Sequence, residues 1–443
     1  MKVMLISLGC DKNLVDSEMM LGILDRAGYT LTSDASCADV IVVNTCCFIG
    51  DAKEESINTL IEYGEYKKKG RLKALIAAGC LAERYTSEIH EDIPEVDAVV
   101  GISSFDRIAG VIENVLNGKS ADAKDDKSRL IYGRKRMLST GGHYAYLKIA
   151  EGCNKHCTYC VIPQVRGPYR SVPMEALLAE AQELVSGGVR ELILVAQETT
   201  VYGVDLYGEK KLYELIEKLC AIEELNWVRL LYCYPEEIDD KLIEVMERET
   251  KFCHYLDMPI QHSEDEILKR MGRKTDKKEI KAIVARLRSR IPDIALRTTL
   301  IAGFPGETDT QHEALCDFVR EMRFSRLGVF PYSAEEDTPA AAMEGQIDEE
   351  EKRRRAEHIM DLQQQTAFEE AAAMKGRVIS CIAEGRIPEN NVLVLRSYKD
   401  APEVDGYVFV EDAPDIMSGT VLDIRITGSE EYDLIGEIYN EPC

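Results

Sequence analysis

The sequence predicts an α/β protein in three parts: an N-terminal doubly wound open sheet, a central partial (β/α) barrel and a small antiparallel β-barrel at the C-terminus. Three observations predict this arrangement. Short apolar runs alternate with helix-period segments up to residue 116, which is the pattern of parallel βα units. A longer series of six such units begins at Tyr144, as in a barrel. Beyond residue 376 the chain breaks into short strands separated by turns, which is typical of a small β-barrel.

The first part, residues 1–118, contains four apolar runs that we expect to be buried parallel strands. These runs are Lys2–Cys10, Asp39–Cys47, Leu72–Cys80 and Val96–Gly101. Three segments with helical periodicity alternate with them: Leu14–Ala27, Asp51–Lys67 and Ser103–Leu116. Residues 119–143 are polar and include Gly141-Gly142, so we predict that they form a linker.

The central part, residues 144–347, repeats the βα rhythm six times, and the strand ends of such a barrel form its reactive face. The expected strands are Tyr146–Glu151, Glu191–Gln197, Val228–Tyr234, Tyr255–Ile260, Leu296–Gly303 and Arg326–Tyr332. The expected helices are Pro173–Ser186, Leu212–Ile222, Glu236–Glu249, Lys277–Arg290 and Asp309–Met322.

A long charged helix, residues 348–375, is predicted to connect the barrel with the last part. Asp348 offers an N-cap and Glu351 follows three residues later, which is a helix-start signal. Residues 376–443 then carry the expected strands of the small β-barrel: Arg377–Ala383, Asn391–Arg396, Gly406–Val410, Thr420–Thr427 and Asp433–Tyr439.

Three cysteines follow the first strand of the central part in the pattern C-x-x-x-C-x-x-C. Cys153, Cys157 and Cys160 give iron three thiol ligands within eight residues and leave one iron of a four-iron cluster open to a substrate. A zinc knuckle, a redox pair and a disulfide are the alternatives. The spacing, the aromatic Tyr159 and the lack of a nearby fourth cysteine favour the cluster. We interpret His156, inside the loop, as a surface residue.

A second set of cysteines lies at the carboxyl ends of three expected strands. Cys10, Cys46 and Cys80 follow these strands in order, and ligands bind at this edge of an open α/β sheet. We therefore predict a second cluster with three protein ligands, against the alternative of ordinary buried cysteines. Cys47 is an ambiguity, because adjacent strand residues point to opposite faces and only one of the pair can face the site.

Composition indicates a chain that works in the cytoplasm. The 443 residues are 45% hydrophobic and 30% charged, as in ordinary globular proteins, and no apolar run is long enough to cross a membrane. The apolar start before Cys10 is too short for a signal peptide. Fourteen cysteines in such a chain favour reduced thiols and metal binding over disulfides. The net charge of −25 disfavours nucleic-acid partners and favours basic proteins.

With these motifs in place, essentially the whole chain resembles the methylthiotransferase family of radical S-adenosylmethionine (SAM) enzymes. The resemblance is carried by Ser7–Glu18, Asn44–Cys46, Gly79–Leu81, Glu151–Gly167 and Gly303–Glu307. Asp400–Gly406 and Glu430–Leu434 look most like the branch that modifies an aspartate of a small-subunit ribosomal protein. In this family the C-terminal barrel is called TRAM.

The resemblance implies two [4Fe–4S] clusters and SAM as cofactors. Cys153, Cys157 and Cys160 would hold the cluster that binds SAM and starts radical chemistry at an unactivated carbon. The resemblance assigns the second cluster, with the sulfur to be inserted, to Cys10, Cys46 and Cys80. Candidate SAM contacts at the barrel rim are Tyr159, Gln197, Glu198, Gln261, Arg297 and Gly303. The alternative is that these are polar rim residues with no ligand, and we interpret His262 in that way.

Charge separates the two substrate classes of the family. Residues 376–443 carry 14 acidic and 5 basic residues, a net charge of −9, whereas an RNA-binding barrel should be basic. The charge favours a basic protein substrate without direct nucleic-acid binding. The resemblance then implies methylthio insertion at the β-carbon of an aspartate in a basic ribosomal protein, with an external electron donor. The alternatives are a MiaB-like enzyme acting on a modified adenosine of transfer RNA, and a non-catalytic iron–sulfur or zinc protein.

Overall fold

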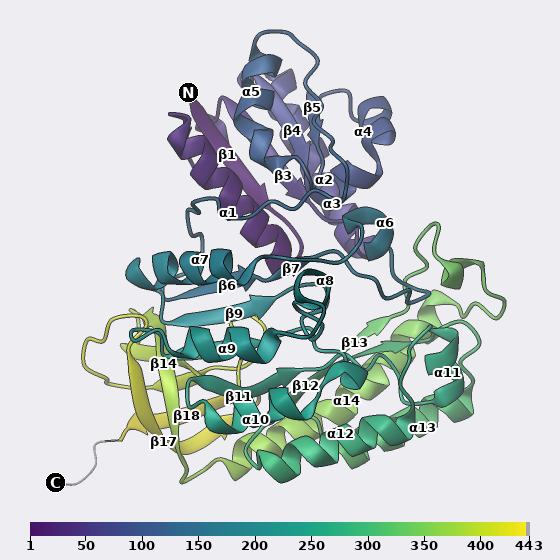
Figure 1. The fold of residues 1–443 in the computed structure, drawn as a ribbon, viewed down its shortest axis with the longest axis vertical. Helices are drawn as coiled ribbons and strands as arrows, with labels where there is room; N and C mark the ends of the chain where they lie inside the picture. The colour runs from purple at the N-terminus through teal and green to yellow at the C-terminus, as the bar shows by residue number, and fades with distance from the viewer. Residues whose placement is uncertain (440–443) are drawn as a thin grey trace.

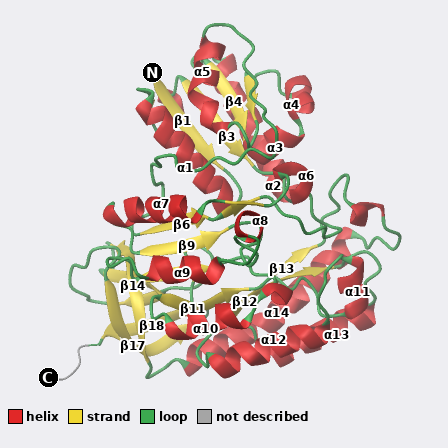
Figure 2. Ribbon diagram, in the orientation of Figure 1, coloured by secondary structure: helices red, strands yellow, loops and turns green. Residues whose placement is uncertain are grey.

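A computed structural model describes residues 1–439, and the last four residues of the predicted segment 376–443 lie outside this range. Figure 1 shows the N-terminal α/β unit at the top, the central sheet with its helices below it, and the C-terminal barrel beside the lower end of that sheet. Figure 2 shows helices flanking the sheets of the first two units, whereas the third consists mainly of strands. In residues 1–439 no helix is both long and apolar enough to cross a lipid bilayer.

The N-terminal sheet is parallel throughout and has the order β2-β1-β3-β4-β5. Its strands are β1 (Lys2–Ser7), β2 (Thr30–Leu31), β3 (Val40–Thr45), β4 (Ala74–Ala78) and β5 (Ala98–Val100). The doubly wound open sheet predicted from the apolar runs is confirmed. The two-residue edge strand β2 was not predicted, because two residues are too few to show a hydrophobic period.

Helices cover both faces of this sheet. One face packs against α1 (Asp11–Arg26) and α5 (Ile108–Leu116), and the other against α2 (Gly50–Lys68), α3 (Gly79–Arg84) and α4 (Thr86–Asp92). Short 3-10 turns lie at Ala35–Cys37 and Phe105–Arg107. The sequence pattern missed α3 and α4, since helices of six and seven residues are too short for a clear 3.6-residue period.

Residues 117–143 contain neither helix nor strand, yet they are fixed to the units on both sides. The buried Arg136 guanidinium donates to Glu18 of α1 at 2.5 Å and to Glu180 at 2.8 Å. Glu180 lies on α7 (Met174–Ser186) of the central unit. The segment is therefore a packed connection, because a buried charged pair resists separation when either partner would be left unpaired.

The central sheet is parallel and has the order β13-β12-β11-β10-β9-β6. Its strands are β6 (Tyr144–Lys148), β9 (Glu191–Val195), β10 (Trp227–Leu230), β11 (Phe252–Asp257), β12 (Ala295–Ala302) and β13 (Arg326–Pro331). In the described part of the chain β6 and β13 are the two free edges, so the barrel is partial, as predicted. A small hairpin, β7 (Ala150–Glu151) with β8 (Arg170–Ser171), follows β6.

The central unit contains all five helices that the sequence predicted, α7 and four others. These four are α9 (Leu212–Cys220), α10 (Asp240–Arg248), α12 (Lys277–Arg290) and α13 (Asp309–Met322). Short helices that escaped prediction are α6 (Ile162–Arg166), α8 (Val204–Tyr207) and α11 (Asp265–Arg270), with 3-10 turns at Pro235–Glu237 and Pro339–Ala342. An apolar core joins these helices to the sheet.

Helix α14 (Glu349–Ala373) leads into the C-terminal barrel. The Asp348 carboxylate caps its start by accepting the Glu351 backbone N–H at 3.0 Å, as predicted from the capping signal. The closed barrel has the order β14-β15-β16-β18-β17, with β14 (Val378–Ile387), β15 (Val392–Ser397), β16 (Val408–Val410), β17 (Val421–Glu430) and β18 (Asp433–Ile438). The pairing is antiparallel except between β16 and β18, which pair in parallel.

The loop Asp400–Gly406 docks this barrel onto the central sheet. Tyr255 of β11 donates to Asp405 at 2.8 Å, Tyr144 of β6 donates to Glu403 at 2.9 Å, and Arg326 of β13 pairs with Asp400. Three sheet strands therefore contact one acidic loop. This contact gives a structural reason for the Asp400–Gly406 motif that the sequence analysis singled out.

Candidate functional site

The three N-terminal cysteines lie after three adjacent strands. Cys10 is the N-cap residue of α1, Cys46 directly follows β3, and Cys80 is in the first turn of α3, just after β4. Because β1, β3 and β4 are neighbours in a parallel sheet, their carboxyl ends meet at one edge. The chain therefore brings together thiols that are up to 70 residues apart in sequence.

Cys46 lies close to the Cys10 end of this edge, and its choice over Cys47 as a ligand stays a prediction. A Cβ atom added to Gly9, next to Cys10, would lie 2.8 Å from the Cys46 sulfur. Cys47 instead packs in the apolar core between the sheet and α2 to α4. Burial raises the pKa of the Cys47 thiol to about 12, and Cys80 lies in the same apolar core. This geometry favours Cys46 as the member of the set.

Backbone contacts on three sides hold the loop of Cys153, Cys157 and Cys160, which connects β7 with α6. The Cys153 N–H donates to the Gly167 carbonyl at 3.2 Å, and the Thr158 N–H donates to the Met271 carbonyl at 2.9 Å. Gly152 opens the loop with φ +80°, and a Cβ atom there would lie 2.1 Å from the Pro168 carbonyl oxygen. Only glycine fits this position.

Burial determines the protonation of two of the loop thiols. Burial raises the pKa of Cys153 to about 11 and that of Cys160 to about 12, so a metal must displace their protons to bind. Neither cysteine set has its three sulfur atoms within 4.8 Å of one another in residues 1–439.

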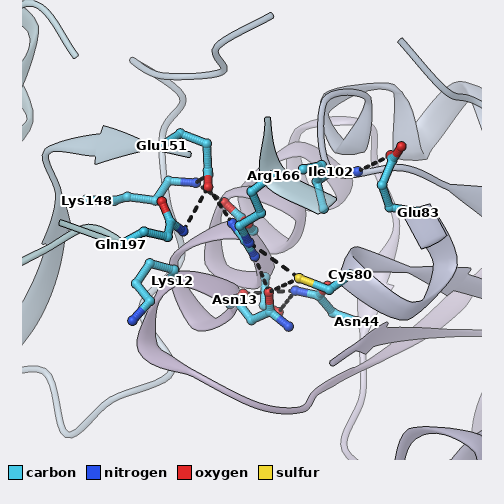
Figure 3. A network of polar contacts seen from close by, with 12 residues as sticks. Lys12, Asn13, Asn44, Cys80, Glu83, Ile102, Lys148, Glu151, Arg166 and Gln197 are labelled. Carbon is cyan, nitrogen blue, oxygen red and sulfur yellow. Dashed lines mark hydrogen bonds and ion pairs between the residues drawn. The ribbon is translucent and has the colours of Figure 1, made fainter. Parts of the chain in front are cut away.

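A buried ionic network connects Cys80 of the N-terminal set with Glu151, two residues before Cys153, as Figure 3 shows. Arg166, at the end of α6, donates from Nε to the Cys80 sulfur at 3.3 Å and from Nη1 to Glu151 at 2.8 Å. Its Nη2 donates to the Asn13 side-chain oxygen. Arg166 is 1% exposed. One guanidinium therefore contacts a thiol of the N-terminal set and a carboxylate at the start of the Cys153 loop.

Further charges complete the network around this arginine. Lys148 of β6 pairs with Glu151 at 2.7 Å and with Asp16 of α1, and Arg166 approaches Asp16 at 3.4 Å. Burial and the two cations act in opposite directions on Glu151, and the cations hold its pKa well below the usual range. Two buried cations thus face two buried carboxylates, and such a network is stable only when complete.

Two of the predicted cofactor contacts, Gln197 and Glu198, follow β9. The Gln197 side chain accepts the Gly152 N–H at 2.7 Å and donates to Glu151 at 3.0 Å, so it supports the cysteine loop. Glu198 is buried, and burial raises its pKa to about 7 although Lys155 lies 3.6 Å away. Tyr159 is half-buried beside Cys157 and Cys160, and its pKa is raised by burial and by these thiols.

The remaining predicted contacts lie on the β11 and β12 side. Gln261 adopts φ +70° and Gly303 adopts φ +73°, and both follow strand ends. Arg297, on β12, lies 3.8 Å from Asp257 and 3.7 Å from Asp405 of the C-terminal barrel loop. Their contact with a cofactor stays a prediction. His156 is exposed, and His262 is buried with Nε2 3.7 Å from Glu307.

Sequence reasoning missed four residues around the cysteines. Tyr234 places its hydroxyl 3.7 Å from the Cys157 sulfur, and the Arg273 guanidinium lies 4.2 Å from the centre of the Tyr234 ring. Lys155 pairs with Glu237 at 2.6 Å, and Arg166 is described above. Tyr234 is the last residue of the predicted strand Val228–Tyr234, and strand ends form the reactive face of such a barrel. Its position could therefore have identified it as a site residue. The two arginines occur in segments without a periodic pattern.

Known families match all three parts of the chain. Residues 2–101 match the family described as "Uncharacterized protein family UPF0004", residues 147–319 match the radical SAM superfamily, and residues 376–438 match the TRAM domain. Two curated relatives are named ribosomal protein uS12 methylthiotransferase RimO. The protein from Lachnoclostridium phytofermentans is 58% identical, and the match covers 98% of this chain and 99% of the relative. The protein from Acetivibrio thermocellus is 48% identical, with 99% of each chain covered.

Solved structures with a similar fold are more distant. The radical SAM methyltransferase TsrM from Kitasatospora setae, bound to cobalamin and a [4Fe–4S] cluster, has a TM-score of 0.58 at 14% identity, with 76% of each chain covered. The cobalamin-dependent radical SAM enzyme OxsB has a TM-score of 0.53 at 13% identity, covering 81% of this chain and 56% of OxsB. At this identity the likeness extends to the fold alone.

Proposed function

Because this chain belongs to the RimO family of ribosomal protein uS12 methylthiotransferases, we propose that it inserts a methylthio group at the β-carbon of an aspartate in that basic protein. The observation that carries the proposal is the buried Arg166 guanidinium, which contacts Cys80 of the N-terminal set and Glu151 at the start of the Cys153 loop. A methylthiotransferase must combine radical formation with sulfur delivery. A guanidinium that touches one cysteine set and the start of the other cysteine loop fits that requirement better than an isolated cluster does.

We assign one [4Fe–4S] cluster to Cys153, Cys157 and Cys160, and a second to Cys10, Cys46 and Cys80. When bound, the first cluster with SAM supplies a radical that removes hydrogen from an unactivated carbon. The fold shields most of these thiols from water. Cys46, Cys80, Cys153 and Cys157 are buried, and Cys10 and Cys160 are half-buried. An external electron donor is part of the proposal, and we place the reaction in the cytoplasm, where ribosomal proteins are made.

The proposed SAM site lies along the strand ends beside the Cys153 loop. Glu198 and Tyr159 face this region next to the thiols, and Gln197 holds the loop through the Gly152 N–H. Gln261, Gly303 and Arg297 line the β11 and β12 side in the proposal. Polar groups at strand ends suit the amino, carboxylate and ribose groups of SAM.

Replacing Arg166 with lysine should separate radical formation from sulfur insertion. Lysine keeps the positive charge toward Asp16 and Glu151, but it cannot form the planar fork that contacts Cys80 and Asn13. We expect SAM cleavage to stay within about threefold of wild type and methylthio product to fall about ten- to a hundredfold, because a misplaced reactive group costs rates of that order. The ratio of deoxyadenosine to methylthiolated product, measured by mass spectrometry, gives the answer.

Lys155→Arg is the matched control, since it also exchanges one cation near the thiols but contacts neither Cys80 nor Glu151. An unchanged ratio in Arg166→Lys would contradict the proposed coupling. So would an equal change of the ratio in both variants.

The substrate class is tested by offering the reconstituted enzyme two substrates in parallel. Ribosomal protein uS12 should gain the mass of one methylthio group on an aspartate, and transfer RNA should gain none, because the acidic C-terminal barrel repels phosphate backbones. A matched uS12 variant with that aspartate changed to asparagine is the control. Modification of the RNA alone would overturn the assignment in favour of the transfer RNA branch.

A further inference from the structure

A separate group of metal-binding side chains lies between α13 and α14, away from the two cysteine sets. His312 and Cys316 are four residues apart on α13 and therefore share one face of that helix. His358 faces them from α14. In residues 1–439 this is the only group of three His, Cys, Asp or Glu residues whose ligand atoms all lie within 4.8 Å of one another.

The three ligand atoms form a nearly regular triangle. His312 Nε2 lies 3.1 Å from His358 Nδ1, and the Cys316 sulfur lies 3.6 Å and 3.7 Å from these two nitrogens. Zinc bonds of the usual length in a tetrahedral site would place two nitrogens about 3.3 Å apart and each nitrogen about 3.6 Å from the sulfur. The observed triangle matches that geometry closely.

A hydrogen-bonded pair of histidines beside a core cysteine is the simpler explanation. That arrangement explains the short distance between the nitrogens, and a thiol can donate weakly to one ring and accept weakly from the other. It gives no particular reason for the sulfur to lie at nearly equal distances from both nitrogens. A metal ion explains all three distances at once.

The surroundings of His312 also suit a metal ligand. Its Nδ1 points toward the Glu307 carboxylate, 3.7 Å away, and Glu307 is itself held by the Gly303 N–H at 2.7 Å and by Arg355 at 3.1 Å. A carboxylate behind the second ring nitrogen is the usual support of a histidine that binds zinc. His312 and Cys316 are buried, while His358 is half-buried, so water can complete the coordination.

We propose that His312, Cys316 and His358 bind a divalent zinc ion that ties α14 to α13. Two imidazoles and one thiolate in tetrahedral geometry are typical zinc ligands. Binding displaces the Cys316 proton, so one proton is released for each ion bound. The ion would fix the helix that leads to the C-terminal barrel, and through Glu307 it would support the Gly303 turn.

The test uses the full chain with its iron–sulfur clusters reconstituted, incubated with zinc sulfate and then desalted. We expect about one zinc per chain by elemental mass spectrometry, and a zinc X-ray absorption spectrum with one sulfur at about 2.3 Å and nitrogens at about 2.0 Å. Cys316→Ala and His358→Ala should each lower the bound zinc at least about tenfold, since even supporting residues cost that much. Cys220→Ala, which removes another buried helix thiol, should leave zinc unchanged.

A second variant keeps the test decisive if an alanine variant folds poorly. His358→Cys should retain zinc and show two sulfur neighbours in place of one, which a purely structural histidine pair would not produce. Absence of zinc from the wild-type chain would overturn the proposal. Zinc that stays in Cys316→Ala, or a single sulfur in His358→Cys, would overturn it as well. None of these outcomes depends on methylthiotransferase activity.

Discussion

Replacing Cys157 with alanine should abolish reductive cleavage of SAM, to below about 1% of the wild-type rate, because two thiols cannot hold the cluster that three thiols hold. Cys157 is the central member of the loop and is buried beside Tyr234, with 3.7 Å between its sulfur and the tyrosine hydroxyl. The loop backbone is held by Cys153, Thr158 and Gly152 contacts, none of which uses the Cys157 side chain. The fold should therefore survive the change.

Deoxyadenosine formed under strong reductant, measured by chromatography and mass spectrometry, is the readout for this variant. Iron content should fall by about half, since the N-terminal set keeps its own cluster. Cys381→Ala is the matched control, because Cys381 is buried in β14 of the C-terminal barrel. Deoxyadenosine formation at the wild-type rate in Cys157→Ala would show that the loop does not hold the radical-generating cluster.

Much of the fold could be predicted because each strand carries its own local signal. The apolar runs Lys2–Cys10, Asp39–Cys47 and Leu72–Cys80 identified three parallel strands, and the parallel topology then required their carboxyl ends to meet. Side-chain direction could not be read in the same way. Whether Cys46 or Cys47 faces the site depended on the exact end of β3 at Thr45, and only the packing of Gly9 against Cys46 distinguished them.

Contacts between distant segments could not be predicted from local pattern. Arg166 reaches Cys80 only because α6 packs against the apolar face of the N-terminal unit through Val161 and Val165. The His312 and Cys316 pair has helical spacing, but His358 lies on another helix. In both cases tertiary packing determines which residue is the partner. Such packing produces no hydrophobic periodicity in the sequence, so a local pattern cannot reveal it.

Replacing Cys10 with alanine should have the opposite pattern of effects to the Cys157 change. We expect SAM cleavage to stay within about threefold of wild type while methylthio product falls below about 1%, because loss of one of three ligands removes the second cluster. Cys10 is the N-cap residue of α1, yet its side chain makes no capping hydrogen bond. The change should therefore leave α1 intact, and lost product would report on the metal site and not on helix stability.

Cys47→Ala provides the matched control for Cys10→Ala. Cys47 lies in the same region but packs into the core, so this variant should keep both SAM cleavage and product, with iron unchanged. Both variants are compared by deoxyadenosine, by the mass of uS12 and by iron per chain. Equal loss of cleavage in Cys10→Ala and Cys157→Ala would contradict two separate clusters. Arg166 donates to Cys80 and to Glu151, so losing the N-terminal cluster should change the rate of SAM cleavage only slightly. Complete loss of SAM cleavage in Cys10→Ala would instead require one cluster shared by both cysteine sets.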